Sequence, residues 1–212
     1  MLQTIVRTPR TEEDIALGAQ LAKMQNRPIG PAEVARVLRD AGIKYVIVGG
    51  HAANGYTGRP RATVDVDVIV QFPKKAADAI AKAFPDLTMQ DTPVVTRFKD
   101  KDLEAIDLMK PTASKLWSRL LKDAREFNVG GDLIFVPNVE GVLAAKFAAM
   151  VSLHRKIADK MIDGGDFIRI VEANPQINLD LLKELGELVY DGGGPEILKL
   201  HSDARAGRQL RI

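Results

Sequence analysis

Residues 45–70 read YVIVGGHAANGYTGRPRATVDVDVIV, and this stretch decides the fold. An apolar, β-branched run at 45–48 is followed by a glycine pair, a spacer and a second β-rich run at 63–70. Within a strand, Asp65 and Asp67 would share one face, because residues two apart point the same way. Neighbouring carboxylates repel each other, and a bound divalent cation relieves that repulsion. The alternative is that both acids form the polar face of a half-exposed strand.

The glycine pair, Gly49 and Gly50, stands between the first strand and an alanine-rich helical turn. Glycines at such a junction let a phosphate chain approach the backbone, and a helix N-terminus offers free N–H donors. A bare pair usually marks only a tight turn, and this one lacks the lysine-and-serine ending of a Walker loop. His51 follows and either touches a phosphate or caps the helix. Arg59 and Arg61 form a basic loop that hints at contact with RNA phosphates.

A third carboxylate is expected from Asp107, which lies among apolar residues of a later predicted strand. Three carboxylates on neighbouring strands can hold two Mg²⁺ ions, or Mn²⁺, because such ions prefer oxygen ligands. Two ions about 3.5–4 Å apart activate an attacking hydroxyl and steady a leaving pyrophosphate. Asp102 and Glu104 are rivals for this third position, although their setting is more typical of a turn.

Lys146 falls near the middle of the apolar face of a predicted helix, where a lysine is unusual. Its ammonium group either reaches a nucleotide phosphate or escapes to water while its stem packs. Arg155 and Asp159 belong to the charged end of the same predicted helix. They form either a solvated face with i, i+4 ion pairs or contacts to a phosphate or an acceptor. Asp163 repeats the charge of Asp159 four residues later, and a solvated face does not explain that repeat.

Composition is that of an ordinary soluble globular protein. The chain is 46% hydrophobic and 27% charged, and no apolar run approaches the roughly 20 residues of a membrane span. It begins without a signal-peptide pattern and contains no cysteine, which excludes disulfides and thiolate metal sites. We therefore expect a cytoplasmic protein without membrane contact. The net charge of +2 argues neither for nor against a nucleic-acid partner.

Hydrophobic periodicity and capping residues predict an alternation of helices and strands along the chain. One helix starts at Thr11 with an apolar stripe reaching Met24, and further helices cover 31–41, 51–56, 73–84, 112–121, 139–163, 166–173 and 179–190. Predicted strands cover 45–48, 63–70, 94–98 and 105–109, with a hairpin at 127–136. We expect chain breaks at 27–31, at Gly164-Gly165 and at the glycines of 192–194.

These elements predict four segments. A helical extension covers 1–30, an α/β domain covers 31–137, a helical domain covers 138–195, and a marginally ordered tail covers 196–212.

The sequence VGG at 48–50, followed by RATVDVDV at 61–68, resembles the nucleotidyltransferase signature of the polymerase-β-like superfamily. That signature is a strand, a Gly-Gly or Gly-Ser pair, a spacer and an acid-x-acid strand. The second run is particularly similar to small prokaryotic minimal nucleotidyltransferases, which include the AbiEii-type toxins of toxin–antitoxin and phage-defence systems. Lys146 and the charged helix after it are similar to the corresponding part of that group, although the charge spacing differs. The resemblance covers roughly 35–175.

The resemblance implies an α/β (α+β) fold, with a mixed β-sheet flanked by helices and a helical C-terminal domain that closes a nucleotide cleft. Both metal ions would bind Asp65 and Asp67, and Asp107 would help to activate the acceptor hydroxyl. The residues that would hold the triphosphate are Gly49, Gly50 and Thr63, with Lys146 steadying its charge.

The implied reaction is transfer of a nucleoside monophosphate from an NTP to an acceptor, with release of pyrophosphate. The acceptor would be an RNA 3′ end or a protein hydroxyl, and a cognate antitoxin is a possible partner. One alternative is a catalytically degenerate module of the same fold that binds a nucleotide or a partner protein without turnover. Another is a plain interaction module whose acids are surface residues.

Overall fold

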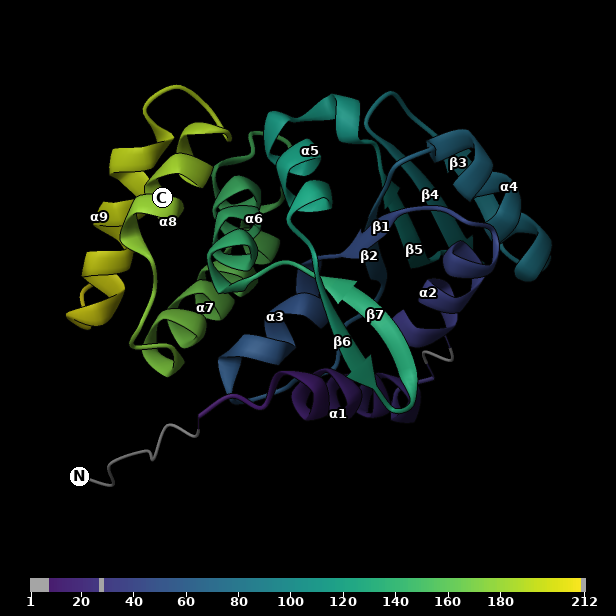
Figure 1. The fold of residues 1–212 in the computed structure, drawn as a ribbon, viewed down its shortest axis with the longest axis horizontal. Coiled ribbons are helices and arrows are strands. Elements are labelled where there is room, and N and C mark those ends of the chain that lie inside the picture. The colour runs from purple at the N-terminus through teal and green to yellow at the C-terminus, as the bar shows by residue number, and fades with distance from the viewer. Residues whose placement is uncertain (1–7, 27–28, 211–212) are drawn as a thin grey trace.

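A mixed five-stranded sheet forms the centre of the first two thirds of the chain (Figure 1). The computed structural model describes residues 8–26 and 29–210. The strand order is β1-β2-β5-β4-β3; β2 and β5 run parallel, and the other neighbouring strands run antiparallel. The strands are β1 (Tyr45–Ile47), β2 (Val66–Val70), β3 (Thr88–Asp91), β4 (Val95–Asp100) and β5 (Leu103–Met109).

A second, two-stranded sheet is the hairpin of β6 (Arg125–Val129) and β7 (Asp132–Val136). It packs between α1 (Thr11–Met24) and α2 (Pro31–Asp40) (Figure 1). Polar contacts fix it there, because Arg36 forms an ion pair with Asp132 and the hydroxyl of Tyr45 donates to the carbonyl oxygen of Leu133. The hairpin therefore joins the N-terminal helices to the edge of the main sheet.

The remaining helices either flank the sheet or gather at the other end of the molecule (Figure 1). Those near the sheet are α3 (Gly49–Thr57), α4 (Pro73–Ala83), the short 3₁₀ helix Pro111–Ala113 and α5 (Lys115–Lys122). Those of the C-terminal part are α6 (Val139–Val151), α7 (Ile157–Ala173), α8 (Leu179–Glu187) and α9 (Gly193–Arg205). Among the described residues, no helix has the length and apolar character that crossing a bilayer requires.

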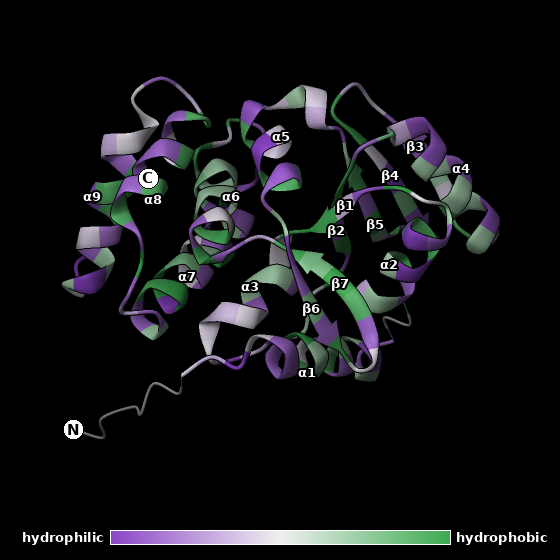
Figure 2. Ribbon diagram, viewed as in Figure 1, coloured by the Kyte–Doolittle hydropathy of each residue, from purple (hydrophilic) through white to green (hydrophobic). Residues whose placement is uncertain are grey.

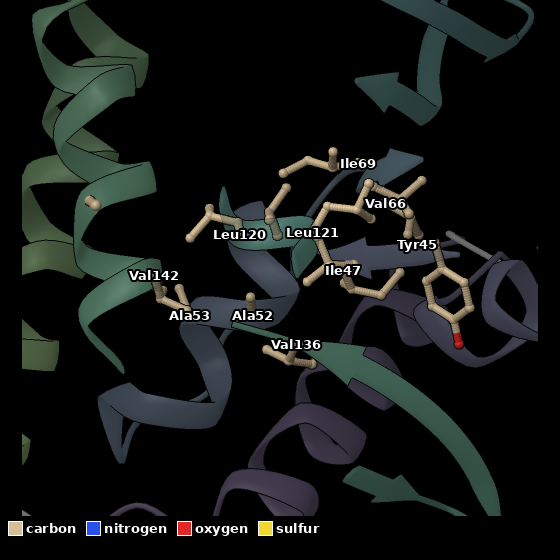
Figure 3. Packing of buried hydrophobic residues seen from close by; sticks show 14 of the residues in the cluster. Tyr45, Ile47, Ala52, Ala53, Val66, Ile69, Leu120, Leu121, Val136 and Val142 are labelled. Atoms are coloured by element: carbon tan, nitrogen blue, oxygen red, sulfur yellow. The ribbon is translucent and has the colours of Figure 1, made fainter. Parts of the chain in front are cut away.

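One contiguous hydrophobic core runs from the sheet into the C-terminal helices. Figure 3 shows Ile47 of β1, Ala52 and Ala53 of α3, Val136 of β7 and Val142 of α6 lying close together within it. Apolar and polar residues alternate along most of the elements, as the colours of the ribbon in Figure 2 show, and such elements pack by turning their apolar residues inward. The helical part is thus fixed against the sheet by burial of apolar surface.

The predicted fold class is confirmed, because the structure has a mixed sheet flanked by helices and a helical part after it. Most predicted elements are present with boundaries shifted by a few residues. The strand predicted at 63–70 begins only at Val66, so Asp65 lies in the loop before it. The break predicted at 27–31 falls partly outside the described residues.

The predicted single helix over 139–163 is wrong. The chain forms α6 and α7 with a break at 152–156, and Gly164-Gly165 lies inside α7 instead of ending a helix. Glycine within a helix costs about 1 kcal/mol. Burial of Phe167, Ile170 and Val171 beyond the pair outweighs that local cost.

Two other expectations also fail. β3 was not predicted, because all four of its residues are exposed and give no apolar alternation to detect. The glycines at 192–194 do not loosen the chain but start α9, whose Ile197, Leu200 and Ala204 are buried in the core.

Candidate active site

Three charged side chains form a row across neighbouring strands of the main sheet. Asp67 on β2 is the register partner of Asp107 on β5, and Asp107 is in turn the partner of Arg97 on β4. Register partners share one face of a sheet, so the three groups lie side by side. The guanidinium of Arg97 donates to both oxygens of Asp107, with Nε–Oδ1 at 2.9 Å and Nη2–Oδ2 at 2.7 Å.

The glycine pair stands directly against this row. A Cβ atom on Gly49 would lie 1.8 Å from Oδ2 of Asp67, and one on Gly50 would lie 2.4 Å from Oγ1 of Thr63. Gly49 also has a φ of 62°, which favours glycine. Both glycines open α3, so the free N–H groups of a helix N-terminus stand next to the Asp67 carboxylate.

Asp65 and Glu104 complete a group of four acids. One oxygen each from Asp65, Glu104 and Asp107 lie within 4.8 Å of one another, which is a span that a single cation can bridge. Arg97 reaches this group too, because its Nη1 lies 2.9 Å from a carboxylate oxygen of Glu104. All ligand atoms offered here are carboxylate oxygens, the type that Mg²⁺ and Mn²⁺ prefer.

Burial and mutual repulsion raise the pKa values of two of the acids. Burial, together with the charges of Asp107 and Glu104, raises the pKa of Asp65 to about 6. Burial also raises the pKa of Asp67 well above its usual value, and the charges of Asp65 and Asp107 add to that effect. Carboxylates with raised pKa values in one place are typical of a site that binds a cation.

A second charged cluster lies between α6 and α7. Lys146 is buried, and its ammonium group lies 2.9 Å from Asp163 and 2.8 Å from Asp166. Its head is held by two aspartates and does not escape to water, whereas its reach to a nucleotide phosphate stays a prediction. Lys146 is also close enough to the acids of the sheet for its charge to lower the pKa of Asp67, against the larger opposing effect of burial.

Two arginines join this cluster from other elements. Arg155 lies 2.6 Å from Asp163, and Arg61 forms two bonds to Asp166, at 3.1 and 2.7 Å. These bonds and the charge of Lys146 lower the pKa of Asp166 against the opposing effect of its burial. The like charges of Asp159 and Asp163 are therefore explained by the contacts of Asp163, which forms ion pairs with Lys146 and Arg155.

The loop that carries Arg61 is held by Asn54 of α3. The amide of Asn54 donates to the carbonyl oxygen of Arg61 and accepts from its backbone N–H, at 2.8 and 3.0 Å. Arg59 is exposed in the same loop, and Asp159 is partly exposed on α7. Neither of those two side chains forms an ion pair with another residue in the described part of the chain.

His51 is fully buried on the first turn of α3 and is directed away from solvent. Its Nδ1 atom has no hydrogen-bond partner among the described residues, and burial lowers its pKa to about 4. It is therefore a neutral residue of the core.

Sequence reasoning missed Arg97 and left Glu104 as a rival of Asp107. In the structure both Glu104 and Asp107 belong to the site. A basic residue two strands from an acid pair carries no sequence signal, because only the β4–β5 register brings Arg97 to Asp107.

Comparison with known proteins gives no match to any protein-family model and none to any curated protein sequence. Solved structures do match. An antigenic nucleotidyltransferase-like protein from Paracoccidioides brasiliensis is 17% identical, with 92% of this chain and 95% of that chain covered and a TM-score of 0.50. This chain has a nucleotidyltransferase fold.

Two further solved structures match to a similar degree. JHP933 from Helicobacter pylori is 18% identical over 90% of both chains, with a TM-score of 0.50. The antibiotic-resistance factor ANT(2'')-Ia is 12% identical, with 72% of this chain and 85% of that chain covered and a TM-score of 0.50. At these identities the likeness to all three structures establishes the fold alone.

Proposed function

We propose that this chain is a metal-dependent nucleotidyltransferase that moves a nucleoside monophosphate from an NTP to an acceptor and releases pyrophosphate. One observation carries the proposal. Asp67 and Asp107 lie side by side on parallel strands, with Asp65 and Glu104 beside them and the Gly49 backbone against Asp67. Acids gathered beside a helix N-terminus provide ligands for cations on one side and donors for phosphate on the other.

Each predicted site residue then has a role that its position supports. Asp65 and Asp67 would hold the metal ions, and Asp107 would orient the acceptor hydroxyl and accept its proton. The α3 N-terminus at Gly49 and Gly50 would bind the triphosphate through backbone N–H groups. Thr63, packed against Gly50, would shape that turn.

Mg²⁺ or Mn²⁺ fits this donor set, because the oxygens of Asp65, Glu104 and Asp107 already converge within 4.8 Å. When bound, such ions neutralise charge on the phosphates and lower the pKa of a bound hydroxyl. Lys146 and Arg155 would add positive charge from the helical side, where Asp163 positions both of them. Arg59, Arg61 and Asp159 would lie along the approach of the acceptor, which we propose to be an RNA 3′ end or a protein hydroxyl.

The test is incorporation of label from each of the four α-³²P NTPs into candidate RNAs and proteins, with Mg²⁺ present and pyrophosphate release measured in parallel. Wild-type protein should label an acceptor. Asp67→Asn keeps the side-chain shape and removes the charge, so it should lower the rate by about 10²-fold or more. Asp86→Asn, an exposed acid away from the site, serves as the control. Absence of label and of pyrophosphate with every NTP contradicts the proposal.

A second candidate is nucleotide binding without turnover. The observation that favours it is Arg97, which engages both oxygens of Asp107 and one of Glu104. Arg97 therefore competes with an acceptor hydroxyl for both oxygens of Asp107, which would slow turnover without preventing nucleotide binding. Mg²⁺-dependent nucleotide binding that never yields pyrophosphate would support this candidate over the first.

We also propose a biological role for the protein, as a toxin of a toxin–antitoxin or phage-defence system. The RATVDVDV run and the Lys146 helix support an AbiEii-like toxin with a cognate antitoxin, acting in the cytoplasm. Induced expression should then slow growth, and Asp67→Asn should remove that effect. Equal growth inhibition by both proteins contradicts the toxin role.

A further inference from the structure

A β-bulge places Glu104 on the same face of the main sheet as Asp107. The two residues are three positions apart on β5, so in a regular strand their side chains would point to opposite faces. The register between β4 and β5 shifts at Phe98/Lys99, which makes Lys99 the partner of Glu104. Glu104 therefore joins Asp107 on the face that carries Arg97, as bulges beside functional sites commonly re-aim a side chain.

Arg97 bridges these two acids. Its Nε and Nη2 atoms donate to the two oxygens of Asp107, at 2.9 and 2.7 Å, and its Nη1 atom lies 2.9 Å from Oε1 of Glu104. Both acids also belong to the group whose oxygens converge with one of Asp65 within 4.8 Å. A divalent ion on those oxygens would compete with Arg97 for the same negative charge. Since 32% of its side chain is exposed, Arg97 can withdraw into water when it is displaced.

The charge of Arg97 separates a free ion from an ion that arrives with a nucleotide. When ionised, the four acids of the site carry four negative charges, of which Arg97 already offsets one. A free divalent ion must enter beside this resident positive charge, which repels it. A complex of the ion with a triphosphate has a net negative charge, so its phosphates can offset the guanidinium group as well as the ion.

We propose that Arg97 lowers the affinity of the site for free Mg²⁺ or Mn²⁺, so that the ion binds preferentially as a complex with the nucleotide. Arg97 would thereby determine the form in which the metal enters. The same contact helps to explain how four acids gather on one face of the sheet in the metal-free protein, because Arg97 relieves part of their repulsion. This inference rests on the proposed metal-dependent nucleotide site.

The experiment measures two affinities of the metal-free full chain. The first is for Mn²⁺ alone, measured from the EPR signal of the unbound ion. The second is for the complex of Mn²⁺ with each non-hydrolysable NTP analogue, measured by calorimetry. Wild-type protein should bind one of the complexes about tenfold or more tightly than the free ion. Arg97→Met should bind free Mn²⁺ about tenfold or more tightly than the wild type does, because the competing cation is gone.

Arg119→Met is the matched control. The side chain of Arg119 is 31% exposed and also bridges two carboxylates, those of Asp123 and Glu184, but it lies on α5. Its removal should leave both affinities unchanged.

Arg97→Lys keeps the charge but cannot fork between two carboxylates, so its affinity for free Mn²⁺ should lie between those of the wild type and Arg97→Met. It also provides the test if Arg97→Met does not fold, which near-UV circular dichroism shows. The inference is overturned if the folded Arg97 variants bind free Mn²⁺ no more tightly than the wild type, or if Arg119→Met tightens binding equally. In that case binding of the Mn²⁺–analogue complex to the wild type would still support the proposed site. Binding of neither Mn²⁺ nor its complexes to any of these proteins would contradict both.

Discussion

At the scale of the residue, Gly49 is required by both its conformation and its neighbour. Its φ is 62°, and an added Cβ would lie 1.8 Å from Oδ2 of Asp67. We expect Gly49→Ala to lower the free energy of unfolding by about 2–4 kcal/mol, because backbone strain and a displaced carboxylate add together. Gly42→Ala is the control, since Gly42 has a φ of 64° and open space around it, and it should cost only about 1 kcal/mol. Equal losses in chemical denaturation would show that the Asp67 contact is unimportant.

Asp65 makes stability depend on pH in the metal-free protein. Burial and the neighbouring charges of Asp107 and Glu104 raise its pKa from the ordinary 3.8 to about 6, so the folded state binds the proton more tightly. The stability linked to that proton is fully present below about pH 4 and is lost as the pH rises through about 6. Relative to Asp65→Asn, the wild type should therefore lose about 1–3 kcal/mol between pH 4 and pH 7.

The measurement is urea unfolding of both proteins in EDTA at several pH values. Adding Mg²⁺ at pH 7 should restore the wild type and leave Asp65→Asn unchanged, because the ion replaces the lost proton. Parallel stability curves for the two proteins would contradict the raised pKa of Asp65.

At the scale of the element, Lys146 holds α6 to α7 through two buried aspartates. Lys146→Met should lower the free energy of unfolding by about 3–5 kcal/mol, because it leaves negative charge buried with fewer partners. Lys160→Met on α7 removes a partly exposed lysine without an ion pair in the described residues, so it should change stability by less than about 0.5 kcal/mol. Thermal and urea unfolding compare the two. A Lys146→Met protein as stable as Lys160→Met would mean that the aspartates are not charged.

The same pair of helices shows where sequence patterns stop being informative. The apolar period continues past Val151, so one long helix is the natural prediction for 139–163. Only tertiary contacts favour the break, since folding back at 152–156 brings Asp163 and Asp166 to Lys146. Lys146 could be singled out from its place on an apolar face, but its partners could not.

At the scale of the whole molecule, the N-terminal helix is coupled to the candidate site. A Cβ on Gly18 of α1 would lie 2.0 Å from Nδ2 of Asn54, which holds the Arg61 loop. Gly18→Val should therefore destabilise the protein by about 1–3 kcal/mol and loosen that loop. Gly165→Ala has space for its methyl group and should be neutral or slightly stabilising. Thermal unfolding measures the first effect, and hydrogen exchange at Arg61 measures the second. Unchanged exchange would contradict the coupling.

Much of this architecture could be predicted from residues 45–70 and the acids downstream. The glycine pair, the acid-x-acid run and Asp107 indicated one site on neighbouring strands, and the structure places Asp67 beside Asp107. The Arg97 ion pair could not be predicted, because it depends on the register of β4 against β5. The division into four segments stays a prediction.

We propose above that these acids and the glycine turn form one cation-dependent nucleotide site. The most direct measurement is the thermal shift of the wild-type protein with non-hydrolysable NTP analogues, with and without Mg²⁺. We expect a rise in melting temperature only when nucleotide and Mg²⁺ are both present, and no rise in the Asp65→Asn, Asp67→Asn double variant. A wild-type protein that shows no Mg²⁺-dependent shift with any of the four analogues would contradict it.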